Sequence, residues 1–99
     1  MKRERFFIMC RELESNQMIY TEVEGKEVFR VNGFRFFLHE GDKISDVLSG
    51  CLITWWRFGF ESYEEFIGRA KKKIEKEFDL YISEVKKALR VRKRFKAIG

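Results

Sequence analysis

The sequence has few of the residues that mark disulfide-rich, metal-binding or catalytic proteins. Its 99 residues include no proline, two cysteines and one histidine. Cys10 and Cys51 are too few for a disulfide framework and lack the spacing of metal ligands, which predicts two buried thiols in a reducing, cytoplasmic compartment. No glycine-rich phosphate loop, zinc spacing or dinucleotide fingerprint occurs, so we expect neither a cofactor nor a metal.

Catalysis also lacks a recognisable set of residues. His39 is the only imidazole, and no spacing around it identifies a nucleophile and a base. Carboxylates such as Glu64 and Glu65 precede the lysine run at 71–73, which is typical of charge pairing on a solvated helix. We therefore expect a binding protein rather than an enzyme.

Long apolar runs are missing as well. No segment approaches the roughly 20 apolar residues that a membrane-spanning helix needs, and the charged residues 1–5 do not introduce a signal peptide, so we expect no membrane partner. The composition is nevertheless that of a chain that folds, with 44% hydrophobic and 16% aromatic residues. The length suits one domain over residues 1–99.

Acidic residues are absent from the end of the chain. The last one is Glu84, and seven of the 21 lysines and arginines follow it. Residues 1–85 therefore contain the other 14 lysines and arginines together with all 16 aspartates and glutamates. Such a basic segment is typical of an arm that binds nucleic acid or a nucleoprotein, although the helix dipole alone also favours cations at a helix end. The residues expected to contact phosphates are Lys86, Lys87, Arg90, Arg92, Lys93, Arg94 and Lys96.

Alternating apolar residues and turn signals predict an antiparallel sheet of four to five strands over residues 1–60. The first strand is apolar on both faces, which predicts a central position. A turn at residues 24–26 is expected to separate the second strand from the third. The expected strands are residues 5–11, 18–23, 28–31, 34–38 and 51–58, and residues 44–48 form either a further short strand or an irregular crossing.

The clearest local signal is Asn32-Gly33 between two apolar runs, which predicts a type I′ hairpin. The two-residue turn sets the register, so that Val28 should pair with Phe37. One face of the hairpin is apolar and should point to the core. That face comprises Phe29, Val31, Phe34, Phe36 and Leu38.

On the other face of the hairpin, the same register places Arg30 directly opposite Arg35. Two like charges in this position repel one another, so something should compensate them. Either Glu22 or Glu24 neutralises the arginines, or they form an anion-binding patch, or they are simply solvated. In the second case Phe37 would stack beside both guanidinium groups, a combination that suits single-stranded nucleic acid.

Ser62, followed three residues later by Glu65, is a capping box that predicts a helix from Tyr63. Apolar residues recur every 11 positions, and residues 69–98 contain no proline or glycine, so the helix should run to about residue 93 within a helical region at 62–95. The expected fold is α+β, with one long C-terminal helix or two shorter ones packed on the sheet.

A straight helix of about 45 Å would overhang a compact domain of this size by several turns. Its second half still carries Tyr81, Val85 and Leu89, which need a partner. Either a second protomer or a host protein covers them, or the helix breaks near Asp79 and folds back.

The two adjacent tryptophans form a second candidate surface. Neighbouring residues of a strand point to opposite faces, so at least one of the two rings should point away from the helix side. Exposed tryptophan is a frequent hot spot of protein interfaces. The residues expected to bind a partner protein are Trp55, Trp56, Tyr81, Val85 and Leu89.

From residue 31 to residue 74 the chain runs from the hairpin at Asn32-Gly33 through Ser49-Gly50-Cys51-Leu52-Ile53 to the capped helix Ser62-Tyr63-Glu64-Glu65-Phe66. This order of features resembles a class of short bacteriophage and prophage proteins, some of which inhibit host defence, including anti-CRISPR proteins. The resemblance implies a non-enzymatic binding protein of mobile-element origin and assigns no functional residue.

Three hypotheses follow. The leading one is a small protein that binds nucleic acid or a nucleoprotein through its basic C-terminal helix. The second is an inhibitor of a host defence nuclease complex, of the anti-CRISPR type, that docks through its tryptophan-rich strand and helix stripe. The third is a structural homodimer whose basic end is only a helix terminus.

Overall fold

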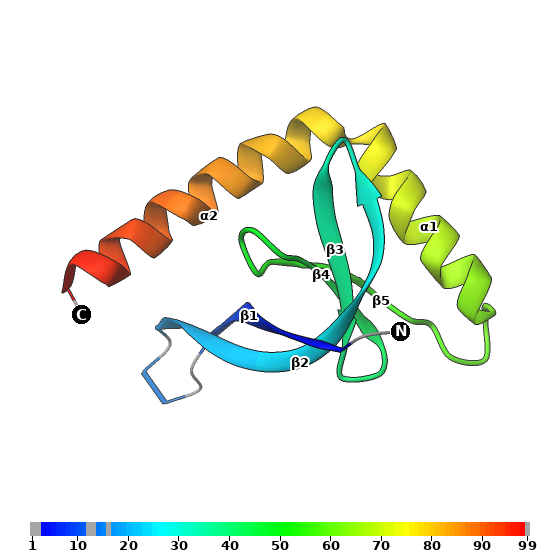
Figure 1. The fold of residues 1–99 in the computed structure, drawn as a ribbon, viewed down its shortest axis with the longest axis horizontal. Helices are drawn as coiled ribbons and strands as arrows, with labels where there is room; N and C mark the ends of the chain where they lie inside the picture. Colours follow the sequence, from blue (N-terminus) through cyan, green and yellow to red (C-terminus); the bar gives the residue numbers. More distant parts are fainter. Residues whose placement is uncertain (1–2, 12–13, 16, 99) are drawn as a thin grey trace.

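The computed structural model describes residues 3–11, 14–15 and 17–98, with residues 11, 18 and 91–98 described by their backbone alone. Five antiparallel strands form one sheet in the order of the chain, and two helices follow (Figure 1). The expected α+β fold with an antiparallel sheet is confirmed. The elements are β1 (Glu4–Arg11), β2 (Met18–Val31), β3 (Phe34–His39), β4 (Lys43–Asp46), β5 (Leu52–Trp55), α1 (Tyr63–Lys76) and α2 (Phe78–Ile98).

β2 is one continuous strand that pairs with two neighbours. Its first half, up to Gly25, pairs with β1, and its second half pairs with β3. The expected turn at residues 24–26 is therefore wrong. Gly25 serves close packing instead of a turn, because a Cβ there would lie 2.5 Å from the carbonyl oxygen of Leu38.

The hairpin between β2 and β3 has the predicted turn. Asn32 and Gly33 have φ values of +50° and +84°, and positive φ at both central residues is what a type I′ turn requires. The turn places Arg30 opposite Arg35, as expected.

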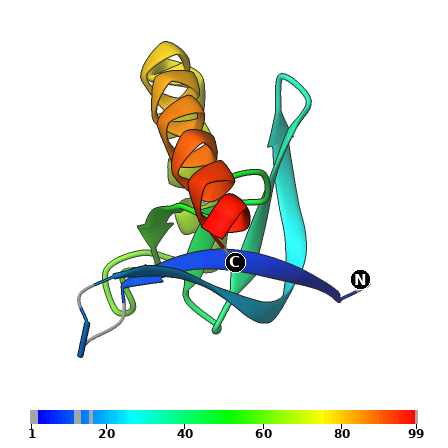
Figure 2. The same ribbon diagram turned by 90° about the vertical axis from the view of Figure 1, so that its left-hand side faces the viewer.

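Further from the turn, the predicted register is wrong. The pairing shifts by one residue between Glu27 and Phe29, so that Phe37 pairs with Glu27 and not with Val28. Such a bulge bends a strand and increases its local twist. Together with the close approach at Gly25, it lets the β1–β2 ribbon turn across the back of β3 (Figure 2).

β3 has hydrophobic clusters on both of its faces. The smaller cluster joins Phe6, Ile8 and Phe37, with the rings of Phe6 and Phe37 stacked at 4.1 Å. The strand covered on both sides is therefore β3, whereas β1 lies at the edge of the sheet, contrary to the central position expected for it. The larger cluster, on the helix side, has the buried members Val31, Phe36, Leu38, Ile44, Phe66, Ala70, Ile74, Tyr81 and Val85.

The loop between β4 and β5 closes onto β1. The backbone N–H of Met9 donates to the carbonyl oxygen of Gly50 at 2.9 Å. Gly50 has a φ of +74°, and a Cβ there would lie 2.6 Å from the carbonyl oxygen of Phe7, so only glycine fits. The two ends of the sheet are thereby brought together.

The last strand is shorter than expected. β5 covers only Leu52–Trp55, because the chain then leaves the sheet for a loop that leads into α1. Residues 43–46 form a short strand, β4, whose pairing with β5 shifts register between Ile44 and Ser45, so the first of the two alternatives for that segment is confirmed as far as Asp46. Cys10 and Cys51 are free and half-buried, so they are less enclosed than predicted.

The helical region is broken. Ser62 and Glu65 form the reciprocal capping box, and α1 begins at Tyr63 as predicted. The helix ends at Glu77, whose φ of −112° departs from helical geometry, and α2 then leaves in a new direction (Figure 1). The single overhanging helix is therefore wrong, and the alternative of a break near Asp79 is confirmed.

Burial of α2 against the sheet explains the break. Tyr81 and Val85 are 7% and 5% exposed, and the Tyr81 ring lies 5.6 Å from Phe34 and 5.3 Å from Phe36. Burying a large apolar side chain contributes roughly 1.5–3 kcal/mol. A hydrogen bond contributes only about 0.5–1.5 kcal/mol. Bending the helix to bury two such side chains is therefore favourable even where helical hydrogen bonds are lost.

A buried polar cluster also holds α2. Tyr81 Oη donates to Asp46 Oδ1, and the backbone N–H and Oγ of Ser49 donate to Asp46 Oδ2 at 2.8 and 2.7 Å. The Asp46 carboxylate is fully buried, so these three donors replace its hydration. Burial, followed by the hydrogen bond to Asp46, raises the pKa of Tyr81, which keeps the hydroxyl protonated as a donor.

Candidate nucleic-acid interface

The described part of the basic segment lies on the outward face of α2. Lys86, Lys87 and Arg90 are exposed, whereas Tyr81 and Val85 are buried on the opposite side of the same helix. A helix rotates by 100° per residue, so positions 86, 87 and 90 fall within one sector of its surface. The sequence thus produces a cationic face because the apolar positions determine which side of α2 is covered.

Carboxylates do little to neutralise this face. Lys87 lies 3.5 Å from Glu84, an exposed pair of the kind that contributes at most about 1 kcal/mol. Among the side chains that the structure describes, Lys86 and Arg90 take part in no ion pair. The side chains of the other expected phosphate contacts lie outside the described residues; these are Arg92, Lys93, Arg94 and Lys96.

The arginine pair of the hairpin is neutralised within the sheet. Glu27 accepts hydrogen bonds from both Arg30 and Arg35, and Glu4 accepts one from Arg35 at 2.7 Å. The hydrogen bond from Arg35 holds the pKa of Glu27 below its ordinary value. Neutralisation was one of the three expected outcomes, but Glu27 and Glu4 perform it in place of Glu22 or Glu24. Arg35 is therefore largely engaged by its neighbours.

The ring expected to stack on a base beside these arginines is not available. Phe37 is 0% exposed, because the β1–β2 ribbon covers the face of β3 on which it lies. Its ring packs on Phe6 and near His39. The assignment of Phe37 to a nucleic-acid surface is therefore wrong.

Arg30 stays exposed at the tip of the hairpin. It lines a groove of about 340 Å³ together with Lys71 and Glu75 of α1. This groove joins two cations from separate elements, but it holds a carboxylate as well. It is a weaker anion site than the outward face of α2.

The helix residues expected to bind a partner are internal. Tyr81 and Val85 belong to the main core, and Leu89 packs against it half-buried. For Tyr81 and Val85 the assignment to a partner interface is therefore wrong, because the break at Glu77 lets the chain cover its own apolar stripe. For the half-buried Leu89 it stays a prediction. No second protomer is needed for that purpose.

The two tryptophans differ in exposure, as predicted. Trp55 is 57% exposed, whereas Trp56 is half-buried and stacks on Phe66 with parallel rings at 5.8 Å. Trp56 Nε1 also donates to the carbonyl oxygen of Glu61 at 3.1 Å. Trp55 is thus the more accessible of the two to a ligand.

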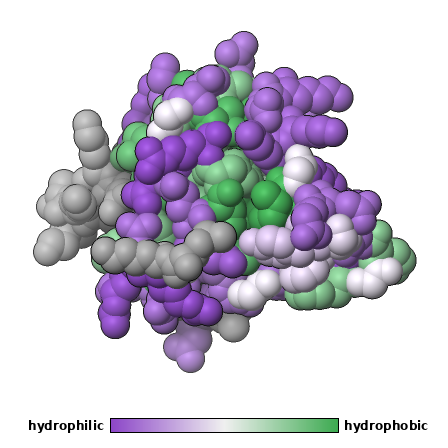
Figure 3. Space-filling view, turned by 45° about the vertical axis from the view of Figure 1, so that its right-hand side comes forward, coloured by the Kyte–Doolittle hydropathy of each residue, from purple (hydrophilic) through white to green (hydrophobic). Residues whose placement is uncertain are grey.

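Sequence reasoning missed the most exposed aromatic residues. Phe58 and Phe60, in the loop between β5 and α1, are 58% and 89% exposed. Their distinguishing signal was Gly59 between them, which has a φ of +84° and turns the loop outward. Figure 3 shows that the surface on this side is largely hydrophilic, with hydrophobic patches between the charged side chains.

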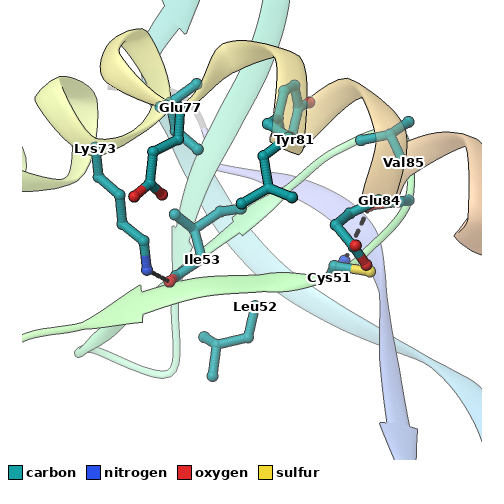
Figure 4. Close-up of a pocket in the computed structure, with 11 residues that line it drawn as sticks. Cys51, Leu52, Ile53, Lys73, Glu77, Tyr81, Glu84 and Val85 are labelled. Carbon is teal, nitrogen blue, oxygen red and sulfur yellow. Dashed lines mark hydrogen bonds between the residues drawn. The ribbon is translucent and has the colours of Figure 1, made fainter.

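The bend between the helices leaves a groove of about 240 Å³ above β5 (Figure 4). Lys73 and Glu77 lie at one end and Glu84 with Cys51 at the other, above the side chain of Ile53. Lys73 Nζ donates to the carbonyl oxygen of Ile53 at 3.1 Å, so this cation covers the edge of β5. Burial raises the pKa of the Cys51 thiol, which keeps it protonated.

His39, the single imidazole, is buried. Its Nε2 lies 2.8 Å from Ser45 Oγ, and burial lowers its pKa below the ordinary value. Within the described residues, no group of three or more His, Cys, Asp or Glu side chains is placed to hold a metal ion. Neither described helix combines the length and the apolar character that a membrane crossing demands.

Comparisons of the chain with protein-family models, with curated proteins and with solved structures yield no match. A function has to follow from the chemistry of the chain itself.

Proposed function

We propose that this protein binds nucleic acid through the outward face of α2. The observation that carries the proposal is the exposure of Lys86, Lys87 and Arg90 on the side of α2 opposite its buried stripe. Four further lysine and arginine residues follow in the sequence, and no aspartate or glutamate follows Glu84. Phosphate contacts from lysine and arginine supply most of the affinity of non-specific nucleic-acid binding.

The alternative that these cations merely stabilise the helix end explains less. Cations interact favourably with the helix dipole within about the last turn. Lys86 and Lys87 lie three turns before the end of α2 at Ile98, which is beyond that range. Their charge therefore remains available to an external anion.

The experiment is a fluorescence-anisotropy titration of labelled single-stranded and duplex DNA at several salt concentrations. The full chain is compared with the triple variant Lys86→Gln, Lys87→Gln and Arg90→Gln. We expect salt-dependent binding by the unmodified protein. In the variant, affinity for duplex falls, and the slope of log K against log salt becomes shallower by about 0.9 for each phosphate contact removed.

α1 supplies a control with the same loss of charge. Lys72 and Lys76 are also exposed, and their replacement by Gln removes two positive charges from a different helix, as the double variant Lys86→Gln and Lys87→Gln does from α2. This variant should keep the salt slope of the unmodified protein. Equal losses in the two double variants would show a response to net charge alone and overturn the assignment to α2, as would binding that does not depend on salt.

A further inference from the structure

The loop between β5 and α1 presents aromatic rings to solvent. Trp55, Phe58 and Phe60 are the most exposed aromatic residues of the described chain, at 57%, 58% and 89%. Large apolar side chains that gather on a surface mark a binding site more often than single ones do. All three belong to one short segment of the chain, residues 55–60.

Hydrogen bonds hold this loop in its outward conformation. The backbone N–H groups of Phe60 and Glu61 donate to the carbonyl oxygen of Arg57 at 3.1 and 3.2 Å, which closes a tight turn. Glu61 Oε1 accepts from the backbone N–H of Arg57 at 3.1 Å, and the Glu61 carbonyl accepts from Trp56. A ligand would therefore meet a loop whose backbone is already held in place, which lowers the entropic cost of binding.

Ring contacts connect the loop to the core. Phe66 stacks on Trp56 with centroids 5.8 Å apart, and Trp56 lies 4.3 Å from Phe58, with the two rings tilted by 33°. Phe58 is still 58% exposed beside Trp56, so much of its side chain is open to solvent. A planar ring of a ligand could pack on this exposed part.

Charge around the loop favours an anionic ligand with flat rings. Arg57 is exposed between the aromatic residues, and the protein carries a net charge of +5. Glu61, four residues further along the chain, interacts with Arg57 and is also bound by Arg69 at 2.6 Å, so two guanidinium groups share this one carboxylate. Aromatic rings combined with cations bind unpaired bases of single-stranded nucleic acids, whereas the bases of a duplex are already stacked.

Resting on the proposed function, we propose that Phe58 and Phe60, with Arg57, bind the unpaired bases of a single-stranded nucleic acid. The phosphate contacts come from α2, and the loop adds base stacking. The loop and the far end of α2 lie at opposite ends of the molecule, whose longest dimension is 42 Å (Figure 1). A strand of about 20 nucleotides can reach both, because stacked nucleotides rise about 3.4 Å each.

The test compares the double variant Phe58→Ala and Phe60→Ala with the unmodified full chain. Both are titrated with a labelled single strand of this length and with the corresponding duplex. Stacking contributes about 1–3 kcal/mol per base, so affinity for the single strand should fall at least fivefold for each base that loses its partner. Affinity for the duplex should stay unchanged.

A matched control removes exposed apolar side chains that have no ring. Leu52 and Leu80 are 48% and 59% exposed, and their replacement by Ala should leave binding to both DNA forms unchanged. Quenching of intrinsic tryptophan fluorescence gives a second readout, because Trp55 and Trp56 adjoin the site. We expect quenching by the single strand and not by the duplex.

The outcomes separate this inference from the proposed function. If the unmodified protein binds neither DNA form, the proposed function fails. If it binds both, and the phenylalanine variant binds the single strand as tightly as before, only the inference is overturned. An equal loss for single strand and duplex also overturns it. In that last case the rings would serve the fold or a protein partner.

Discussion

The two helices carry the same kinds of charged residue and use them differently. On α1, Arg69 donates to Glu61 at 2.9 and 2.6 Å, to Thr54 Oγ1 at 2.9 Å and to the carbonyl oxygen of Trp55 at 3.0 Å. Lys73 donates to the carbonyl oxygen of Ile53. These two cations cover the outer edge of β5, which would otherwise be open to pairing with another strand. The cations on the outward face of α2 have no comparable acceptors among the described side chains.

The comparison teaches that the number of basic residues in a helix says little about binding. What matters is whether the fold supplies acceptors for them. α1 lies beside a strand edge and a loop carboxylate, so part of its charge holds the structure together. α2 is held by Tyr81 and by apolar contacts instead, which leaves its cations available for a ligand.

Replacing the main cation of α1 should give the largest effect on stability. Arg69→Met removes the bonds to Thr54, Trp55 and Glu61 and keeps most of the aliphatic stem. We expect a loss of about 2–3 kcal/mol in the free energy of unfolding, because acceptors at the edge of β5 lose their donor. Urea denaturation measures it, and affinity for duplex per folded molecule should not change, because the duplex is expected to contact α2. A stability within about 0.5 kcal/mol of the unmodified protein would contradict a structural role for this cation.

Removing the Tyr81 hydroxyl, which anchors α2, should lower the free energy of unfolding by a smaller amount. Tyr81→Phe keeps the ring and removes the hydroxyl that donates to the buried Asp46 carboxylate. We expect a loss of about 1–2 kcal/mol, the usual cost of leaving a buried acceptor with one donor fewer. Tyr63→Phe on α1 is the matched control and should cost less than about 0.5 kcal/mol. If the triple Gln variant of α2 destabilises the protein more than Tyr81→Phe does, the cations hold α2 after all.

Lowering the pH should give the smallest of the three effects on stability, through the ion pair that attaches α1 to the loop before it. The hydrogen bonds from Arg69 lower the pKa of Glu61 from 4.5 to about 2. The unfolded chain takes up a proton near the ordinary value, so the contribution of this pair is complete above pH 4.5 and is lost as the pH falls towards 2. Thermal unfolding across that interval measures the loss. In Glu61→Gln the pH dependence should be shallower than in the unmodified protein, and equal slopes would contradict the prediction.

Features that depend on a few neighbouring residues could be predicted from the sequence. Asn32-Gly33 forms the predicted turn because type I′ geometry requires positive φ at both positions. Ser62 and Glu65 form the predicted cap because their side chains reach backbone groups only three residues away. The exposure of Lys86, Lys87 and Arg90 agrees with the helical pattern for the same reason.

Features that depend on distant contacts could not be predicted. Gly25 suggested a turn, but it permits the close approach of β3. Phe37 shares a strand face with charged residues, which suggested exposure. It is buried by Phe6 and Ile8 of β1, which lie about 30 residues earlier in the chain. Phe58 was expected within a strand over residues 51–58, but the chain leaves the sheet after Trp55. Hydrogen bonds between Arg57 and Glu61 then hold Phe58 in an exposed loop.

The sequence by itself determined the hairpin turn at Asn32-Gly33, the start of α1 and the accumulation of positive charge after Glu84. Local geometry and composition suffice for these. Only the tertiary structure decided that the helix bends at Glu77, which arginines are neutralised, and which rings meet solvent. The reason is physical: burial and charge pairing are set by groups far apart in the chain, and small differences in their free energy select one arrangement over another.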